Sequence, residues 1–124
     1  MENHRILIVE DDEAIAGTVS RIIESWGLTP RCVRDFRDVL REFTDFDPHL
    51  VLMDITLPFF NGYHWCSEIR KISAVPIIFV SSASENMNIV MAVDMGGDGF
   101  IAKPFDPSVL MAKIRACLLY TSDA

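Results

Sequence analysis

The chain has 124 residues, of which 50% are hydrophobic and 23% are charged, and this composition predicts a single folded domain. Its formal net charge of −7, without any run of Lys and Arg, argues against direct nucleic-acid binding by this chain. The hydrophobic runs are too short for a membrane-spanning helix, and the N-terminal residues do not form a secretory signal. We therefore expect a cytoplasmic protein that has no contact with a membrane.

Short hydrophobic runs alternate with longer stretches of helical pattern along the chain. The strongest runs are uninterrupted by polar residues, which is typical of parallel strands that are buried on both faces. Glycine after a helical stretch and proline at a helix start mark the element boundaries. In chain order, the sequence predicts a strand at residues 6–9, a helix at 13–26, a strand at 31–34, a helix at 37–43, a strand at 50–53, a helix at 63–72, a strand at 77–80, a helix at 86–95, a strand at 100–102 and a helix at 107–119.

Five strand–helix units in succession predict an α/β fold with a doubly wound, five-stranded parallel sheet and helices on both of its faces. In a fold of this kind, ligands bind beyond the carboxyl ends of the strands. Polar residues stand at those ends: Glu10 and Asp11, Asp54, Ser81 and Lys103. Each one alone is typical of a turn, a helix cap or a surface charge, but together they indicate a site at one edge of the sheet.

Clustered carboxylates raise one another's pKa unless a cation lies between them, and oxygen ligands favour a hard ion such as Mg²⁺. With the ion bound, Asp54 can act as a nucleophile toward phosphorus and form an aspartyl phosphate. Lys103 would balance the remaining negative charge, and Ser81 would donate a hydrogen bond. The residues therefore predict a Mg²⁺-dependent phosphoacceptor site.

Several short motifs follow one another at set spacings along the chain. They are Val9-Glu10-Asp11-Asp12, Met53-Asp54, Leu57-Pro58, Gly62, the run from Pro76 to Ser81, and Lys103-Pro104-Phe105. With these motifs, the chain resembles the receiver domains of bacterial response regulators over residues 5–119. The resemblance implies a flavodoxin-like receiver fold with strand order 2-1-3-4-5, phosphorylated by a sensor histidine kinase. It also implies a switch domain that is not an enzyme, although it assists its own phosphotransfer and dephosphorylation.

The resemblance assigns a role to each residue of the site. Asp54 becomes the phosphoacceptor and a metal ligand. Asp11 is expected to bind Mg²⁺ directly and Glu10 through water, and the backbone carbonyl of Thr56 completes the protein ligands.

The resemblance also implies a switch. Ser81 is the switch hydroxyl, Phe100 is the switch aromatic, and Lys103 contacts the phosphoryl group and precedes a cis-proline, Pro104. Phosphorylation adds about −2 of charge, so Ser81 moves toward Asp54 and Phe100 turns inward. This movement is expected to shift the helix predicted at residues 86–95.

Two other functions compete with this interpretation. A haloacid-dehalogenase-type phosphatase also uses an aspartate nucleophile and Mg²⁺, but it carries the nucleophile on the first strand, whereas the paired acids come first here. A degenerate receiver that only binds partners would not need Asp54, Asp11 and Lys103 together.

The motifs look most like the OmpR/PhoB type of regulator, in which a DNA-binding domain follows the receiver. We expect a receiver domain at residues 1–120 and a polar tail or the start of a linker at residues 121–124. A regulatory fragment of a transcription factor is favoured over a free-standing receiver. Residues 56–58, 60, 62 and 65–66 resemble regulators whose kinases sense cell-envelope or antimicrobial-peptide stress.

Receivers of this type dimerise through the fourth helix, fifth strand and fifth helix by charged pairs. Here Ile89 and Val109 stand at matching positions, and Gly99 stands where an acid is usual, although Asp98, Lys113 and Arg115 could keep part of the ionic set. On phosphorylation we expect a symmetric homodimer that depends more on apolar contacts than on salt bridges.

Overall fold

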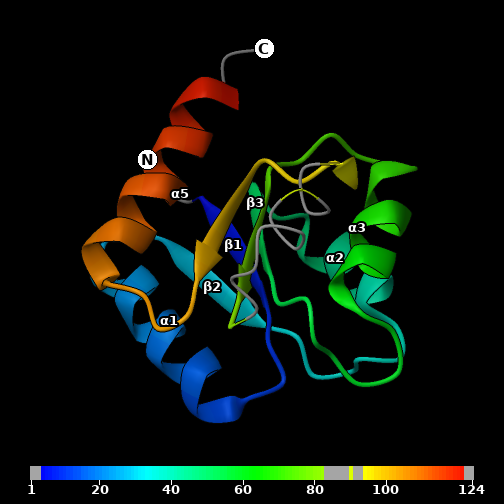
Figure 1. Ribbon diagram of the computed structural model, residues 1–124. Coiled ribbons are helices and arrows are strands. Elements are labelled where there is room, and N and C mark those ends of the chain that lie inside the picture. Colours follow the sequence, from blue (N-terminus) through cyan, green and yellow to red (C-terminus); the bar gives the residue numbers. More distant parts are fainter. Residues whose placement is uncertain (1–3, 83–89, 91–93, 122–124) are drawn as a thin grey trace.

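A computed structural model describes residues 4–82, 90 and 94–121 of the chain (Figure 1). The five strands form one parallel sheet in the order β2-β1-β3-β4-β5, as predicted. No helix among the described residues is long and apolar enough to cross a membrane. The elements are β1 (Arg5–Val9), α1 (Glu13–Ser25), β2 (Thr29–Cys32), α2 (Val39–Phe46), β3 (Leu50–Met53), α3 (Gly62–Arg70), β4 (Ile77–Ser81), β5 (Gly99–Ala102) and α5 (Pro107–Thr121).

The sheet is covered on both faces, with α1 and α5 on one side and α2 and α3 on the other (Figure 1). Successive side chains of a strand point to opposite faces, so β1 contributes to two cores. Ile6 and Ile8 pack in the cluster that includes α1 and α5. Leu7 and Val9 pack in the cluster that includes α2 and α3. Burial on both faces explains why the central strands carry unbroken hydrophobic runs at residues 6–9, 50–53 and 77–80.

The second strand and the second helix differ most from their predicted bounds, and the other described elements differ by no more than two residues at either end. The second strand begins two residues earlier than predicted, because β2 pairs only with β1 and an edge strand tolerates Pro30. The second helix begins at Val39, since the side chain of Asp38 accepts a hydrogen bond from the Arg41 N–H and caps it. The helix predicted at residues 86–95 lies mostly outside the described residues.

The loop between β2 and α2 is organised by a buried carboxylate. Glu42 accepts hydrogen bonds from the backbone N–H groups of Arg34 and Asp35, at 2.9 and 2.8 Å, and is only 9% exposed. The guanidinium of Arg31 contacts the other carboxylate oxygen at 3.3 Å. A helix residue therefore fixes the backbone of the loop that precedes its own helix.

Glu42→Ala is expected to lower the free energy of unfolding by about 3 kcal/mol, because two partly buried N–H groups lose their acceptor. Urea denaturation measures the change. Asp45→Ala removes the same charge from an exposed position of α2 and is the control, with an expected loss of no more than about 0.5 kcal/mol. Equal losses for the two variants would show that Glu42 does not hold this loop.

Candidate functional site

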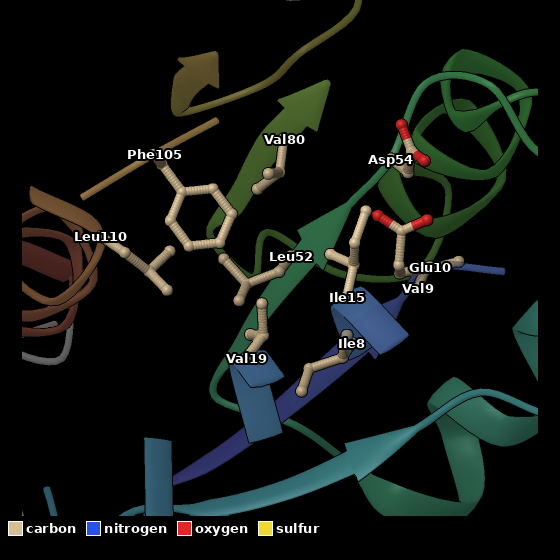
Figure 2. Close-up of a pocket in the computed structure, with 10 residues that line it drawn as sticks. All are labelled: Ile8, Val9, Glu10, Ile15, Val19, Leu52, Asp54, Val80, Phe105 and Leu110. Atoms are coloured by element: carbon tan, nitrogen blue, oxygen red, sulfur yellow. The ribbon is translucent and has the colours of Figure 1, made fainter. Parts of the chain in front are cut away.

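The acidic part of the site lies where β1 and β3 end. Val9 and Met53 are partners in the parallel register, so the residues that follow them are neighbours. The Asp54 N–H donates to the Val9 carbonyl at 2.9 Å, which fixes the start of the loop after β3. Glu10 and Asp54 are 8% and 6% exposed. Figure 2 shows their two carboxylates side by side, next to apolar residues such as Ile15.

A lysine from the other half of the chain completes this arrangement. Ser81 and Ala102 are register partners of β4 and β5, and the Lys103 N–H donates to the Ser81 carbonyl at 2.9 Å. The Lys103 ammonium bonds the carboxylate of Glu10 and lies 3.2 Å from Asp54 Oδ2. The peptide bond between Lys103 and Pro104 is cis, as predicted. The structure thus brings together the first, third, fourth and fifth strand ends, as the sequence predicts.

The site holds more negative than positive charge. Burial raises the pKa of Glu10 and the neighbouring Asp54 adds to that effect, while the Lys103 bond opposes it. Burial also lowers the pKa of Lys103, but the two carboxylates outweigh it and raise that pKa above its ordinary value. The ammonium therefore stays charged, and a single lysine does not neutralise the cluster.

The donor atoms of this cluster fit a divalent cation. One carboxylate oxygen from each of Glu10, Asp11 and Asp54 lies within 4.8 Å of the others. Asp11 is exposed and the other two are buried, so an ion could be bound on one side by buried carboxylates while keeping water on the other. An all-oxygen donor set of this charge suits Mg²⁺.

Gly62 allows the loop after β3 to return close to Asp54. Its N–H donates to the Ile55 carbonyl at 2.8 Å. A Cβ at this position would lie 2.1 Å from the Asp54 carbonyl oxygen, a distance that real atoms do not adopt. Any side chain here would displace the backbone of the phosphoacceptor candidate. The sequence marked Gly62 as part of a motif, but this close approach is visible only in the structure.

The remaining predicted site residues are Ser81, Thr56 and Phe100. Ser81 is 1% exposed at the end of β4. The Thr56 N–H points to Asp54 Oδ1 at 3.4 Å, a long contact, and its carbonyl as a metal ligand stays a prediction. Phe100 lies on β5 beside Phe79 of β4 and packs against the core under α2 and α3, so the structure does not place it in the acidic cluster.

Comparison with known proteins identifies the family. A family model described as the response regulator receiver domain matches residues 6–115. The uncharacterised transcriptional regulatory protein YvcP of Bacillus subtilis (strain 168) is 46% identical over 118 residues, which are 95% of this chain and 50% of that protein. The N-terminal domain of the nisin resistance regulator NsrR, a lantibiotic response regulator, is 49% identical with a TM-score of 0.86, and the match covers 94% of this chain and 99% of that chain.

A solved structure of DrrB from Thermotoga maritima, described as an OmpR/PhoB homolog, is 25% identical with a TM-score of 0.85. That match covers 95% of this chain and 54% of DrrB, and the chain likewise spans about half the length of the curated relatives it matches. The chain belongs to the response regulator receiver domains of two-component signalling, and its relatives are regulators of the OmpR/PhoB type.

Proposed function

We propose that this domain takes up a phosphoryl group on Asp54 in a Mg²⁺-dependent reaction and thereby switches its interaction surface. The observation that carries the proposal is the convergence of three carboxylates with one lysine at the carboxyl edge of the sheet. Asp54 is the residue in this set that contacts Lys103 and also begins the loop closed by Gly62. Its position suits a nucleophile that must be held still.

In the proposed reaction, a carboxylate oxygen of Asp54 attacks the phosphorus of the donor. The new oxygen–phosphorus bond forms as the bond from phosphorus to the leaving group breaks, and the leaving group keeps that electron pair. Mg²⁺, when held by Asp11, Asp54, the Thr56 carbonyl and, through water, Glu10, would neutralise charge on the phosphoryl oxygens. Lys103 supplies a fixed positive charge beside the same oxygens.

The switch follows from the charge that the phosphoryl group adds. Ser81 donates a hydrogen bond to a phosphoryl oxygen and moves toward Asp54, and Lys103 turns from Glu10 to the new group. Ser81 and Phe100 belong to adjacent strands, so a shift at the end of β4 changes the space that the aromatic ring can occupy. Phe100 then turns inward and alters the surface beyond β5.

The proposed donor is a sensor histidine kinase that this domain meets in the cytoplasm. An open groove beside the site supports the docking of a protein: it is lined by apolar α1 residues, including Ile15 and Ile22, and by Phe105 of the loop before α5. NsrR is described as a nisin resistance regulator, and this similarity supports a kinase that senses antimicrobial-peptide or envelope stress. In the longer protein that we propose, transcriptional output belongs to a DNA-binding domain, as the regulatory names of the relatives suggest.

The surface of α5 supports a homodimer. Val109, Ala112, Ala116 and Leu119 are exposed at spacings of three and four residues, which places four apolar side chains along one face of the helix. Ile89, the other residue predicted at the interface, lies outside the described residues.

Charged residues near the proposed interface already have partners within the chain. Asp98 is bonded by Arg70 at 2.8 Å, and the guanidinium of Arg115 lies 4.8 Å from the centre of the Trp26 ring. Both contacts leave less charge for pairing between two copies. We therefore propose that phosphorylated chains associate mainly through apolar contacts.

Acetyl phosphate or a cognate kinase is expected to label the wild-type chain once, and only with Mg²⁺ or Mn²⁺ present. Asp54→Asn should take up no label, because an amide does not attack phosphorus as a carboxylate does. Intact-mass spectrometry measures the number of groups added. A stoichiometric, acid-stable label on the Asp54→Asn protein would refute the assignment.

Asp11→Ala and Ser81→Ala are expected to fail in different ways. Asp11→Ala should abolish labelling, since it removes a direct metal ligand. Ser81→Ala should still be labelled but should not undergo the conformational change, which amide hydrogen exchange of β5 and α5 reports. Equal labelling of wild type and Asp11→Ala throughout a Mg²⁺ titration would remove Asp11 from the metal site.

Val109→Glu, and equally Ile89→Glu, should prevent dimerisation of the chain activated by beryllofluoride without impairing the labelling of Asp54. Sedimentation velocity measures the association, and high salt should weaken the wild-type dimer little because exposed ion pairs contribute little to it. Thr44→Glu adds the same charge to an exposed position of α2, on the face of the sheet opposite to α5, and is the control. A wild-type chain that stays monomeric when activated, or Val109→Glu chains that dimerise normally, would exclude this interface.

A further inference from the structure

The loop that follows Asp54 contains a strained backbone turn. The Phe60 N–H donates to the Pro58 carbonyl at 2.8 Å, which closes a γ-turn with Phe59 at its centre. Phe59 has a φ of 69°, so this is the rare, strained form of the turn. A bulky side chain is seldom found in this region, whereas glycine adopts it without a steric penalty.

Burial of the Phe59 ring does not offset this strain, because the residue is 61% exposed. The ring has one notable partner instead. The guanidinium carbon of Arg37 lies 4.3 Å from the ring centre, which is the geometry of a cation–π contact. The side chain that makes the turn unfavourable is therefore the same side chain that links the loop to another part of the chain.

Arg37 belongs to the loop before α2, whose backbone is firmly held. Its N–H donates to Asp35 Oδ1 at 3.0 Å, and the Asp35 N–H donates in turn to the buried carboxylate of Glu42. The Asp38 N–H bonds the Asp35 carbonyl at 3.2 Å, which closes the turn that carries Arg37. The contact with Phe59 thus extends from a fixed base to the loop after β3.

The loop that receives this contact carries the chemistry of the site. Residues 55–61 run from Asp54 to the start of α3, and Gly62 closes the loop through the Ile55 carbonyl. Thr56, the predicted backbone ligand of Mg²⁺, stands three residues before Phe59 in the same loop. A displacement at Phe59 would therefore be transmitted toward Thr56 and Asp54, since both ends of the loop are pinned.

We propose that Arg37 and Phe59 are positioning residues for the phosphoacceptor site. Their contact holds the loop of residues 55–61 in the conformation that presents the Asp54 carboxylate and the Thr56 carbonyl to a divalent cation. The contact of the ring with the guanidinium offsets part of the strain at Phe59. The inference rests on the proposed function, since it assigns two positioning residues to that same metal and phosphoryl site.

The test measures Mg²⁺ binding by titration calorimetry and stability by urea denaturation, both on the unphosphorylated chain. Phe59→Gly removes the ring and the strain together, so it should weaken Mg²⁺ binding about two- to fivefold, the range that an exposed cation–π contact supports. Its unfolding midpoint should equal or exceed that of wild type. A merely structural role would instead lower stability and binding together.

Matched variants separate the contact from general effects of charge. Arg37→Met should weaken Mg²⁺ binding as much as Phe59→Gly, and the double variant should be no weaker than either single variant. Arg34→Met removes the same charge from the same loop and should leave binding unchanged. Phe59→Tyr and Arg37→Lys preserve a cation–π contact and should retain most of the affinity.

A small donor, acetyl phosphate, tests the consequence for phosphoryl uptake without a protein partner. At Mg²⁺ concentrations below saturation, Phe59→Gly and Arg37→Met should be labelled more slowly by the same factor, and saturating Mg²⁺ should restore the rate. Normal Mg²⁺ affinity in both variants would overturn the inference. If the wild-type chain itself binds no Mg²⁺ and takes up no label, the proposed function fails, and that result is distinct from the first.

Discussion

A single lysine facing three carboxylates is the interaction on which this site depends. Lys103 bonds Glu10 and lies beside Asp54, and Asp11 adds a third acid within reach of the same ion. One positive charge leaves the cluster negative, and Glu10 and Asp54 are nearly buried, so water screens them poorly. A divalent cation would offset the remaining negative charge of the cluster, and a phosphoryl group on Asp54 would change that charge again. A switch that works in the proposed way would need no large cavity, only charges that are not fully compensated.

The rest of the fold serves to hold these charges at one edge. Parallel register places the ends of β1 and β3 side by side, and the pairing of β4 with β5 brings Lys103 to them from 49 residues farther along the chain than Asp54. Two residues support the loops next to the site. Gly62 lets the loop after β3 fold back on Asp54, and Glu42 fixes the loop that carries Arg37. The helices on both faces bury the hydrophobic strands and make the edge rigid.

The strand ends could be predicted from the sequence because the buried parallel strands carry unbroken hydrophobic runs that end at a polar residue. That pattern placed Glu10, Asp54 and Lys103 at one edge, and the structure confirms it. The predicted start of the second strand was wrong, because Thr29 and Pro30 break the hydrophobic pattern of this edge strand. The contact of Arg37 with Phe59 was not predictable, because it depends on a backbone angle and joins two loops that no periodicity relates. The family match decides for a receiver over a haloacid-dehalogenase-type phosphatase.

The most direct test of this account is the affinity of Mg²⁺ for a Lys103→Met chain, measured by titration calorimetry beside wild type. Methionine keeps much of the length of the side chain and removes the only cation that bonds both Glu10 and Asp54 among the described residues. Because the carboxylates then lack compensation, Mg²⁺ should bind several-fold more tightly and should raise the melting temperature more than it does for wild type. Unchanged or weaker Mg²⁺ binding by Lys103→Met would contradict the claim that an uncompensated carboxylate cluster creates this site.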